Sequence, residues 1–231
     1  MLGVETIANT FRFLGDAFHV SSKVVLAHKI EKTKSCSGLS FKTQFLYFLV
    51  FICRYFDIFE FKYRRFMNLY NLILKICFVA FQAVILYLVR IKYYASYDSK
   101  SDTFKIRLLV IPSAVVSLLL KSKSEGVYEW VSEYLYCFSL VLESIAILPQ
   151  LVQLQEEGES ESMTSVFILL LGLYRAMYTI YFLLKWAAGL RVSPVLMACG
   201  MIQVLVYLDF FFVYYKHVFK KTKKTLPTMN K

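Results

Sequence analysis

The stretch Phe45–Phe61, FLYFLVFICRYFDIFEF, is almost wholly apolar and aromatic. Its large apolar side chains cover every side of a helix, which leaves no face for water. Arg54 and Asp57 nevertheless lie inside it. The stretch therefore predicts a helix of a membrane protein that carries a guanidinium and a carboxylate where water is scarce, and charges in such positions usually serve a function.

Composition extends this prediction to the whole chain, because 58% of the residues are hydrophobic, 17% are aromatic and the mean hydropathy is +0.54. These values are typical of an integral membrane protein. Short connections predict one membrane domain over residues 1–219 and a basic tail over 220–231, and the first residues do not resemble a cleavable signal peptide. A spanning helix needs about 20 mostly apolar residues. The pattern thus predicts an all-α protein with seven transmembrane helices, at residues 6–26, 41–59, 66–89, 104–120, 128–151, 163–186 and 193–219.

The distribution of positive charge predicts the orientation. A formal net charge of +11 is also compatible with nucleic-acid binding, but Lys and Arg flanking membrane spans are the simpler explanation, and we predict no nucleic-acid partner. With seven spans, residues 29–42, residues 90–107 and the tail share one side, which carries about twice as many Lys and Arg residues as the other. The C-terminus is predicted to be cytosolic and the N-terminus lumenal or extracellular.

The sequence contains no pattern typical of an enzyme or a metalloprotein. A phosphate-binding glycine loop, a nucleophile elbow and a histidine-based metal motif are all missing from it. We predict no enzymatic activity, no cofactor and no metal. The cysteines are scattered singly and are interpreted as small apolar side chains that fill space, at Cys36, Cys53, Cys77, Cys137 and Cys199.

The first predicted span carries a stripe of polar residues. Successive members lie three or four residues apart, so they share one face of a helix. An amphipathic helix that lies on the membrane surface is one interpretation of such a stripe. Because other spans also carry charge, a polar cavity shared between helices is favoured. The stripe consists of Glu5, Asn9, Arg12, Asp16, His19 and Lys23.

Estimated depth divides the charges within the spans into two sets. Counted from Lys42, Arg54 lies about 18 Å along its helix, in the lumenal half. The set near the lumen holds more cations than carboxylates and predicts a cavity for an anionic ligand, because arginine offers a fork that matches carboxylates. Structural ion pairs, such as Arg54 with Asp57, are the alternative. The lumenal set is Arg12, Arg54, Asp57, Glu133 and Lys185, and the deeper set is Asp16, His19, Glu143, Arg175 and Asp209.

A faint internal repeat relates residues 42–55 to residues 163–176, with Arg54 aligned to Arg175. The fourth span has no ionisable residue between Arg107 and Lys121, which favours contact with lipid or a linking role. Together these features predict two three-helix bundles joined by the fourth span. Transporter folds often place a binding site where such repeats meet.

Six motifs resemble those of the KDEL receptor family. They follow one another along nearly the whole chain with near-constant spacing. The motifs are FRFLGDAFH (11–19), SCSGLSFKTQ (35–44), RYFDIF (54–59), LESIAILPQL (142–151), LGLYR (171–175) and DFFFVYY (209–215).

The resemblance implies a seven-helix fold similar to that of PQ-loop and sugar transporters. It implies a receptor, not an enzyme, that binds the C-terminal KDEL- or HDEL-like tetrapeptide of escaped soluble ER proteins in the more acidic Golgi. The receptor would return them to the ER and release them at neutral pH. The implied partners are this tetrapeptide, the COPI coat and membrane lipids, and the implied location is the ER and Golgi membrane.

The resemblance also implies site residues, carried over motif by motif. His19 belongs to the implied pH-linked network, and an unperturbed histidine pKa of about 6.5 suits a switch between mildly acidic and neutral compartments. The implied ligand-binding residues are Arg12 for an acidic ligand side chain, Arg54 and Tyr55 for the terminal carboxylate, Asp57 and Glu133 for the basic first residue, and Lys185. The rest of the pH-linked network is Glu143, Tyr174, Arg175, Tyr178 and Asp209, and the implied coat-recruiting residues are Lys220, Lys221, Lys223 and Lys224.

The chain departs from the family pattern at several positions, and these bear on tetrapeptide preference. The family usually has arginine at Lys185, tryptophan at Phe182 and Tyr136, and aspartate near Ser193, and its first span is apolar where this chain reads SSK at residues 21–23. For the tail lysines, a simple positive-inside flank is the alternative to coat recruitment.

Two other classes of function stay open at this point. A proton-coupled small-solute transporter of the same fold would use His19 and Asp209 and needs one compact midplane site. A peptide receptor needs cationic contacts spread along an extended ligand. The cations from Arg12 to Lys185 are spread over several helices, which favours the receptor interpretation. A signalling seven-helix receptor fits less well, because the loops are short and paired lumenal cysteines are absent from the sequence.

Overall fold

The computed structural model describes residues 2–59, 66–123, 125–157 and 162–225. Within these ranges the chain is helical and contains no β-strand. A 3-10 turn, η1 (Phe56–Phe59), follows the second helix, and a π-helical turn, η2 (Leu88–Lys92), extends the third. The α-helices are α1 (Leu2–Thr33), α2 (Phe41–Arg54), α3 (Phe66–Tyr87), α4 (Arg107–Leu120), α5 (Val127–Ile145), α6 (Leu148–Glu157), α7 (Ser162–Ala187) and α8 (Pro194–Thr225).

Four helical segments are long and apolar enough to cross a membrane, which agrees with a helical membrane protein. They are Asn68–Lys92, Val127–Gln155, Val166–Ala187 and Pro194–Phe212. The apolar helix Arg107–Leu120 is shorter. α1 is long but carries the charged stripe, and α2 has only 14 residues. The seven-span arrangement therefore stays a prediction, supported by length and composition for four of its members.

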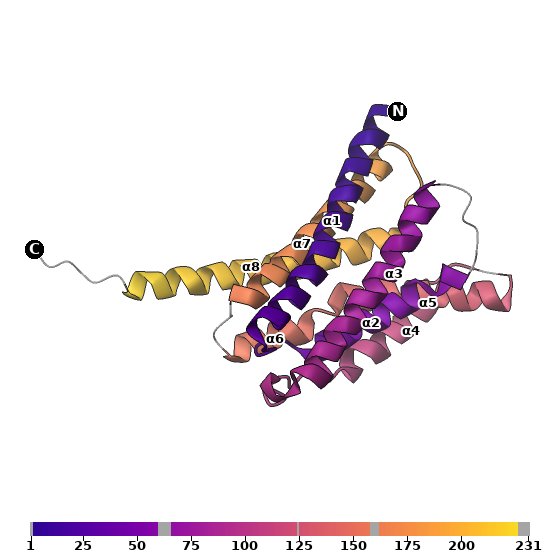
Figure 1. Cartoon of the computed structure of the whole chain (residues 1–231). Coiled ribbons are helices and arrows are strands. Elements are labelled where there is room, and N and C mark those ends of the chain that lie inside the picture. Colours follow the sequence, from indigo (N-terminus) through magenta and orange to yellow (C-terminus); the bar gives the residue numbers. More distant parts are fainter. Residues whose placement is uncertain (1, 60–65, 124, 158–161, 226–231) are drawn as a thin grey trace, which may run out of the picture.

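The helices pack as a ring of six (Figure 1). Around the ring, α1 packs on α7, α7 on α8, α8 on α5, α5 on α2, α2 on α3, and α3 on α1. α4 lies outside this ring and packs along α5. That position agrees with the prediction that the fourth apolar segment, which has no internal charge, takes no part in the polar interior.

The most extensive helix–helix contact in the ring is between α1 and α7. At Gly15 an added Cβ would lie 2.9 Å from Cδ2 of Tyr178, so only glycine permits this spacing. The polar stripe of α1 turns inward here, because Asp16, His19 and Lys23 are buried while Glu5 is exposed. α1 is thus a packed member of the bundle, and the alternative of a helix lying on the membrane surface is wrong.

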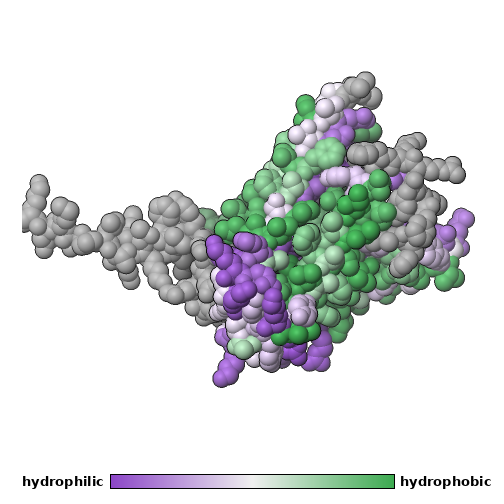
Figure 2. Space-filling model, viewed as in Figure 1, coloured by the Kyte–Doolittle hydropathy of each residue, from purple (hydrophilic) through white to green (hydrophobic). Residues whose placement is uncertain are grey.

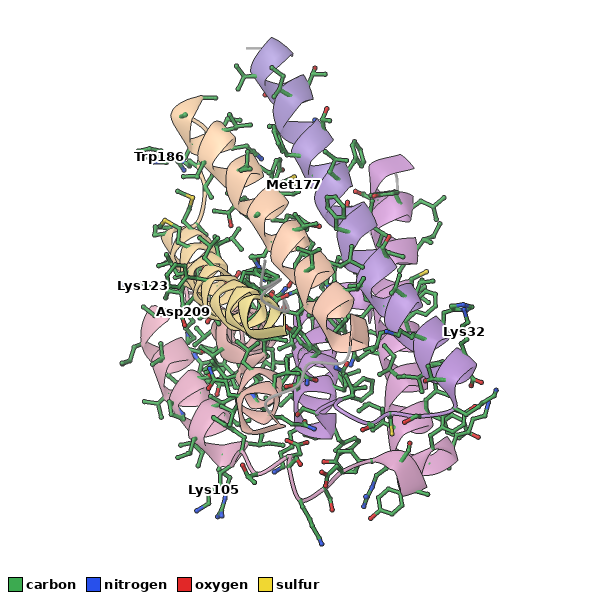
Figure 3. The ribbon with its side chains drawn as sticks, turned by 90° about the vertical axis from the view of Figure 1, so that its left-hand side faces the viewer. Lys32, Lys105, Lys123, Met177, Trp186 and Asp209 are labelled. Atoms are coloured by element: carbon green, nitrogen blue, oxygen red, sulfur yellow. The ribbon has the colours of Figure 1, made fainter. Side chains whose placement is uncertain are left out.

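Apolar side chains cover the outside of the ring. Figure 2 shows a broad hydrophobic surface with hydrophilic residues gathered toward its lower end. Ile76 of α3, Leu119 of α4 and Leu205 of α8 are among the exposed large side chains. Lys105 lies at the lower end of the bundle, Lys32 at its right-hand side and Trp186 toward the upper end (Figure 3). An apolar belt between polar ends is the surface that a bilayer requires.

Two predicted spans are interrupted in the structure. The span predicted over 41–59 ends as an α-helix at Arg54, and Tyr55 caps it before the 3-10 turn. The span predicted over 128–151 breaks between α5 and α6, just before Pro149. Proline lacks the N–H that would continue the helical ladder, which accounts for the second break. At the other end of the chain, α8 continues to Thr225, into the predicted tail.

Candidate functional site

A pocket of about 380 Å³ opens inside the ring of six helices. Every helix of the ring contributes to its wall, and α4 contributes nothing. Aromatic side chains make up much of the lining, and five of the six helices contribute charged side chains to it. The lining residues are Arg12, Asp16, His19, Arg54, Tyr55, Asn71, Leu74, Lys75, Phe78, Tyr136, Leu140, Glu143, Tyr174, Arg175, Tyr178, Tyr181, Phe182 and Leu196.

Two arginines meet on one buried carboxylate at the base of the pocket. Nη1 of Arg54 lies 2.6 Å from Oε2 of Glu143, and Nη2 of Arg175 lies 2.5 Å from the same oxygen. The hydroxyl of Tyr174 donates to the other oxygen of Glu143 at 2.8 Å. These arginines are the pair that the faint repeat aligned, so the two repeated segments, on α2 and α7, converge on α5.

Arg54 keeps an unused donor. Its Nε donates to the hydroxyl of Ser139 at 3.1 Å and its Nη1 to Glu143, but its buried Nη2 has no hydrogen-bond partner among the described residues. A buried guanidinium N–H without an acceptor is costly. The free donor is therefore where an anionic ligand group would gain most.

Nearer the mouth, residues of α1 bond to side chains of α3 and α7. Arg12 donates from Nη2 to Asn71 at 2.6 Å. Asp16 accepts from the hydroxyl of Tyr70 at 2.9 Å and from that of Tyr178. These bonds neutralise no charge on Arg12, which stays available to a ligand carboxylate.

His19 is enclosed by aromatic rings. Its ring stacks on Tyr174 with centroids 4.1 Å apart and planes 7° apart, and it lies 4.2 Å from Phe78 and 5.6 Å from Phe51. The side chain is buried, and its Nε2 atom has no partner in the described part of the chain. Tyr174 also donates a hydrogen bond to Glu143, the carboxylate that pairs with both arginines. His19 is therefore linked to the two arginines through Tyr174 and Glu143.

The structure corrects the predicted grouping of charges. Arg54, assigned by depth to the lumenal set, pairs with Glu143 of the deeper set. Its alternative partner, Asp57, instead pairs with Lys75 at 2.6 Å. The reason is local: α2 ends at Arg54, so Asp57 lies in a 3-10 turn and no longer shares a helical face with the arginine.

Four predicted ligand-binding or network residues are absent from the pocket lining: Asp57, which pairs with Lys75, and the three described next. Lys185 turns toward Tyr181, with Nζ 3.4 Å from the hydroxyl and 5.3 Å from the ring centroid. Glu133 is half-buried on α5, before the pocket-lining turns of that helix. Asp209 is exposed on α8 (Figure 3), so the structure does not bring it to His19 or Glu143. The other predicted ligand-binding and network residues gather at the pocket, with Asp57 at its rim through Lys75.

The structure adds residues that the sequence interpretation missed. Asn71 and Phe78 of α3 line the wall, as does Leu74 between them, and Ser139 of α5 holds Arg54. On α3 these side chains recur at three- and four-residue steps, a periodicity that could have indicated one inward face. Ser139 offered no signal of this kind, because its role depends on which helix α5 faces.

The pocket has an excess of positive charge. Its lining contains four cations, Arg12, Arg54, Lys75 and Arg175, against the carboxylates of Asp16 and Glu143. Even after Asp57 neutralises Lys75, cations exceed carboxylates. In a site with little water, such an excess favours an anionic ligand, and guanidinium groups can bind its carboxylates in a bidentate manner.

A second polar cluster lies at the opposite end of the bundle, where α2 begins. Asp102 is buried and accepts from Ser40 at 3.1 Å, from the backbone N–H of Lys42 at 3.2 Å and from the hydroxyl of Tyr97 at 2.8 Å. Burial and this bond to Asp102 raise the pKa of Tyr97, so the phenol stays a donor at physiological pH. A carboxylate at a helix N-terminus is also favoured by the helix dipole.

Gln150 of α6 completes this cluster. Its Oε1 accepts from the backbone N–H of Ser40 at 2.9 Å, and its Nε2 donates to the carbonyl of Gly38 at 2.8 Å. Its own backbone N–H donates to the hydroxyl of Thr43 at 2.9 Å. The cluster fastens the α1–α2 connection to α6, and we refer to it as the Asp102–Gln150 cluster.

Comparison with known proteins agrees with the motifs. Residues 35–185 match the family model described as ER lumen protein retaining receptor. The ER lumen protein-retaining receptor of Dictyostelium discoideum is 40% identical over 220 residues, which cover 95% of this chain and 99% of that protein. The Drosophila melanogaster receptor of the same name is 38% identical over 219 residues, again 95% of this chain and 99% of the relative. ER lumen protein-retaining receptor 2 of Homo sapiens is 37% identical with the same coverage.

Proposed function

The chain belongs to the ER lumen protein-retaining receptor family, and on this premise we propose that its pocket binds the C-terminal tetrapeptide of soluble ER proteins, of the KDEL or HDEL type. The receptor takes up this ligand in the Golgi and returns it to the ER. The family is one of receptors and not of enzymes.

The unused donor of Arg54 carries the proposal. A peptide C-terminus is the carboxylate that an orphan guanidinium N–H at the base of a cationic pocket accommodates best. Tyr55 lies beside it in the pocket wall and assists. Arg12, nearer the mouth, takes an acidic side chain of the ligand, while the carboxylates Asp57 and Glu133 face its basic first residue.

The decisive test compares peptides that differ only at the C-terminus. Purified full-length protein is immobilised, and binding of a KDEL-type peptide is measured as the free acid and as the amide. Charge-assisted hydrogen bonds contribute about 1.5–3 kcal/mol each, so loss of two should weaken binding at least about 100-fold. Equal binding of the two peptides would refute the role of the carboxylate.

The same assay separates a receptor from a proton-coupled transporter of the same fold. Affinity for a receptor pocket should rise as the ligand grows from the last two residues to four, because each added residue finds its own contacts. A compact solute site would show no such dependence on length.

The pH response is proposed to act through His19. Its stacked ring contacts Tyr174, which holds Glu143 between the two arginines. We propose that peptide binding is accompanied by uptake of a proton on His19. By linkage, affinity is then higher in the acidic Golgi and falls as the pH rises toward that of the ER.

The proposed membrane topology has seven spans, the N-terminus in the lumen and the C-terminus in the cytosol. The six-helix ring with α4 outside it supports two three-helix bundles, α1–α3 and α5, α7 and α8, joined by a linker helix, as in PQ-loop and sugar transporters. An N-glycosylation acceptor added at the N-terminus should be modified in cells, and the same acceptor added at the C-terminus should not. Modification at the C-terminus and not at the N-terminus would show that the topology is the reverse of the proposed one.

The tail is proposed to recruit the COPI coat. Lys220, Lys221, Lys223 and Lys224 belong to the last turns of α8, and their side chains lie outside the described ones. Replacing all four with serine should trap the protein in the Golgi while leaving peptide binding intact. Normal cycling of this variant between Golgi and ER would show that the four lysines do not recruit the coat, and a positive-inside flank would be their only role.

A further inference from the structure

Lys23 is a fully buried lysine that the proposed binding mechanism does not use. It lies on α1 one helical turn after His19 and has 0% exposure. Its Nζ atom has no hydrogen-bond partner among the described residues. A lysine in this situation is unusual, because buried charged groups are normally paired.

Aromatic rings take the place of a hydrogen-bonding partner. Nζ lies 4.3 Å from the centroid of the Tyr47 ring, 5.4 Å from that of Phe51 and 5.5 Å from that of Phe167. Ring faces attract a cation and not a neutral amine. The ring cage therefore offsets part of the cost of burying an ammonium ion at this place in the bundle.

The cage shares a wall with the histidine site. Phe51 packs on His19, with ring centroids 5.6 Å apart, and the centroid of the same ring lies 5.4 Å from Nζ of Lys23. The hydroxyl of Tyr47 bonds to that of Tyr207 at 3.0 Å, which fixes the ring under the ammonium. His19 and Lys23, four residues apart, project from one face of α1.

Charged residues on several helices lie around His19. Arg54 of α2, Glu143 of α5 and Arg175 of α7 line the same pocket as His19. Asp16, on α1 itself, is hydrogen-bonded to Tyr70 of α3 and Tyr178 of α7.

The remaining contacts leave Lys23 without a dedicated counter-charge. From α3 the ring that packs on His19 is Phe78, which has no charge, and α8 contributes Tyr207 beneath the cage. Glu143, which also attracts Lys23, is already engaged by both arginines.

We propose that Lys23 is a positioning residue for the pH response: its caged ammonium opposes protonation of His19 and so lowers the pH below which the receptor binds peptide. This inference rests on the proposed function for its effect on binding, but the electrostatic coupling between the two side chains does not. Lys23 does not line the pocket, so its charge acts on His19 and makes no contact with the ligand.

The test replaces Lys23 with methionine, which keeps the length of the side chain and removes the charge. Full-length protein with isotope-labelled histidine is titrated by NMR in the absence of peptide. His19 should titrate about one pH unit higher in Lys23→Met than in the unchanged protein, because a neighbouring cation has been removed. The exposed His28 should not shift. Lys32→Met removes an exposed charge from the same helix and serves as the matched control.

Peptide affinity measured across the same pH range gives the second readout. The midpoint pH of this binding profile should move upward together with the midpoint of the His19 titration. An unmoved His19 titration overturns the inference, and so does a shifted His19 with an unmoved binding profile. Absence of KDEL-type binding at every pH in the unchanged protein would instead refute the proposed function and leave the coupling to be judged by NMR. If Lys23→Met does not fold, Lys23→Gln supplies the same comparison with a polar, uncharged side chain.

Discussion

The pocket and the Asp102–Gln150 cluster are both polar regions inside an apolar helix bundle, but they differ in how completely their atoms are bonded. In the cluster, Oε1 and Nε2 of Gln150 and both carboxylate oxygens of Asp102 have hydrogen-bond partners. In the pocket, Nη2 of Arg54 and Nε2 of His19 have none among the described residues. Buried polar atoms cost free energy unless they are paired. A complete set of bonds thus indicates a structural role, and an incomplete set indicates room for a ligand or a proton.

This comparison predicts opposite consequences for mutations at the two regions. Changes in the pocket should alter binding more than folding, and changes in the cluster should do the reverse. The predictions below test the contrast, from the largest expected effect to the smallest.

Arg54→Ala should abolish binding of a KDEL-type peptide, with a loss of at least about 100-fold, because two charge-assisted hydrogen bonds are removed. The bundle should still fold, since Arg175 continues to neutralise Glu143. Binding isotherms with free-acid and amidated peptides provide the measurement. The variant should bind both peptides equally weakly. Arg107→Ala, an exposed arginine at the start of α4, is the control. A variant that still preferred the free acid would show that another residue binds the carboxylate.

Gln150→Leu should lower stability without changing peptide affinity. The substitution leaves the backbone N–H of Ser40 buried without its acceptor, which costs about 1–3 kcal/mol. Thermal unfolding of detergent-solubilised protein measures the effect. Gln155→Leu on the exposed face of α6 should leave the unfolding temperature nearly unchanged. A large loss of affinity in folded Gln150→Leu would break the division between the two regions.

His19→Ala should remove most of the pH dependence of binding. In the unchanged protein, affinity should fall about tenfold or more as the pH rises from about 5.5 to 7.5, because the proton taken up on His19 is lost. In the variant the ratio of the two affinities should approach one. His28→Ala, an exposed histidine on the same helix, should keep the original profile. An unchanged profile in His19→Ala would mean that the histidine stays neutral throughout.

Lys185→Arg should have the smallest effect, on selectivity alone. Lys185 reaches the pocket through Tyr181, a lining residue, and its ammonium lacks the planar fork of arginine. The arginine variant should therefore narrow the choice of acidic residue at one ligand position by a few-fold. A peptide array varied one position at a time measures this selectivity in both proteins. The requirement for a free C-terminus should be the same in both. Identical array profiles would indicate that Lys185 only extends toward the interface.

Much of the candidate site follows from residue spacing. The stripe on α1 predicted which face turns inward, and Asp16, His19 and Lys23 are buried there. The repeat predicted that Arg54 and Arg175 are equivalent, and both arginines bind Glu143. These inferences succeeded because a helix fixes which residues share a face, whatever surrounds it.

The pairing of charges could not be predicted in the same way. Estimated depth separated Arg54 from Glu143 and placed Asp209 with the deep set, whereas the structure joins the first two and leaves the third exposed. Depth counts residues along one helix. A depth estimate therefore takes no account of the early end of α2 at Arg54. It also takes no account of how α8 is rotated about its axis, which decides the direction of Asp209.

The sequence by itself determined that this is a helical, apolar chain of the ER lumen protein-retaining receptor family with charges placed where water is scarce, because composition and local periodicity act within single helices. Only the tertiary structure decided which charges neutralise one another, which donor of Arg54 stays free and what surrounds Lys23. Those outcomes depend on distances between side chains far apart in the chain. An interaction in a medium with little water changes steeply with such distances, so the order of helices around the ring, and not their sequence order, sets the chemistry of the pocket.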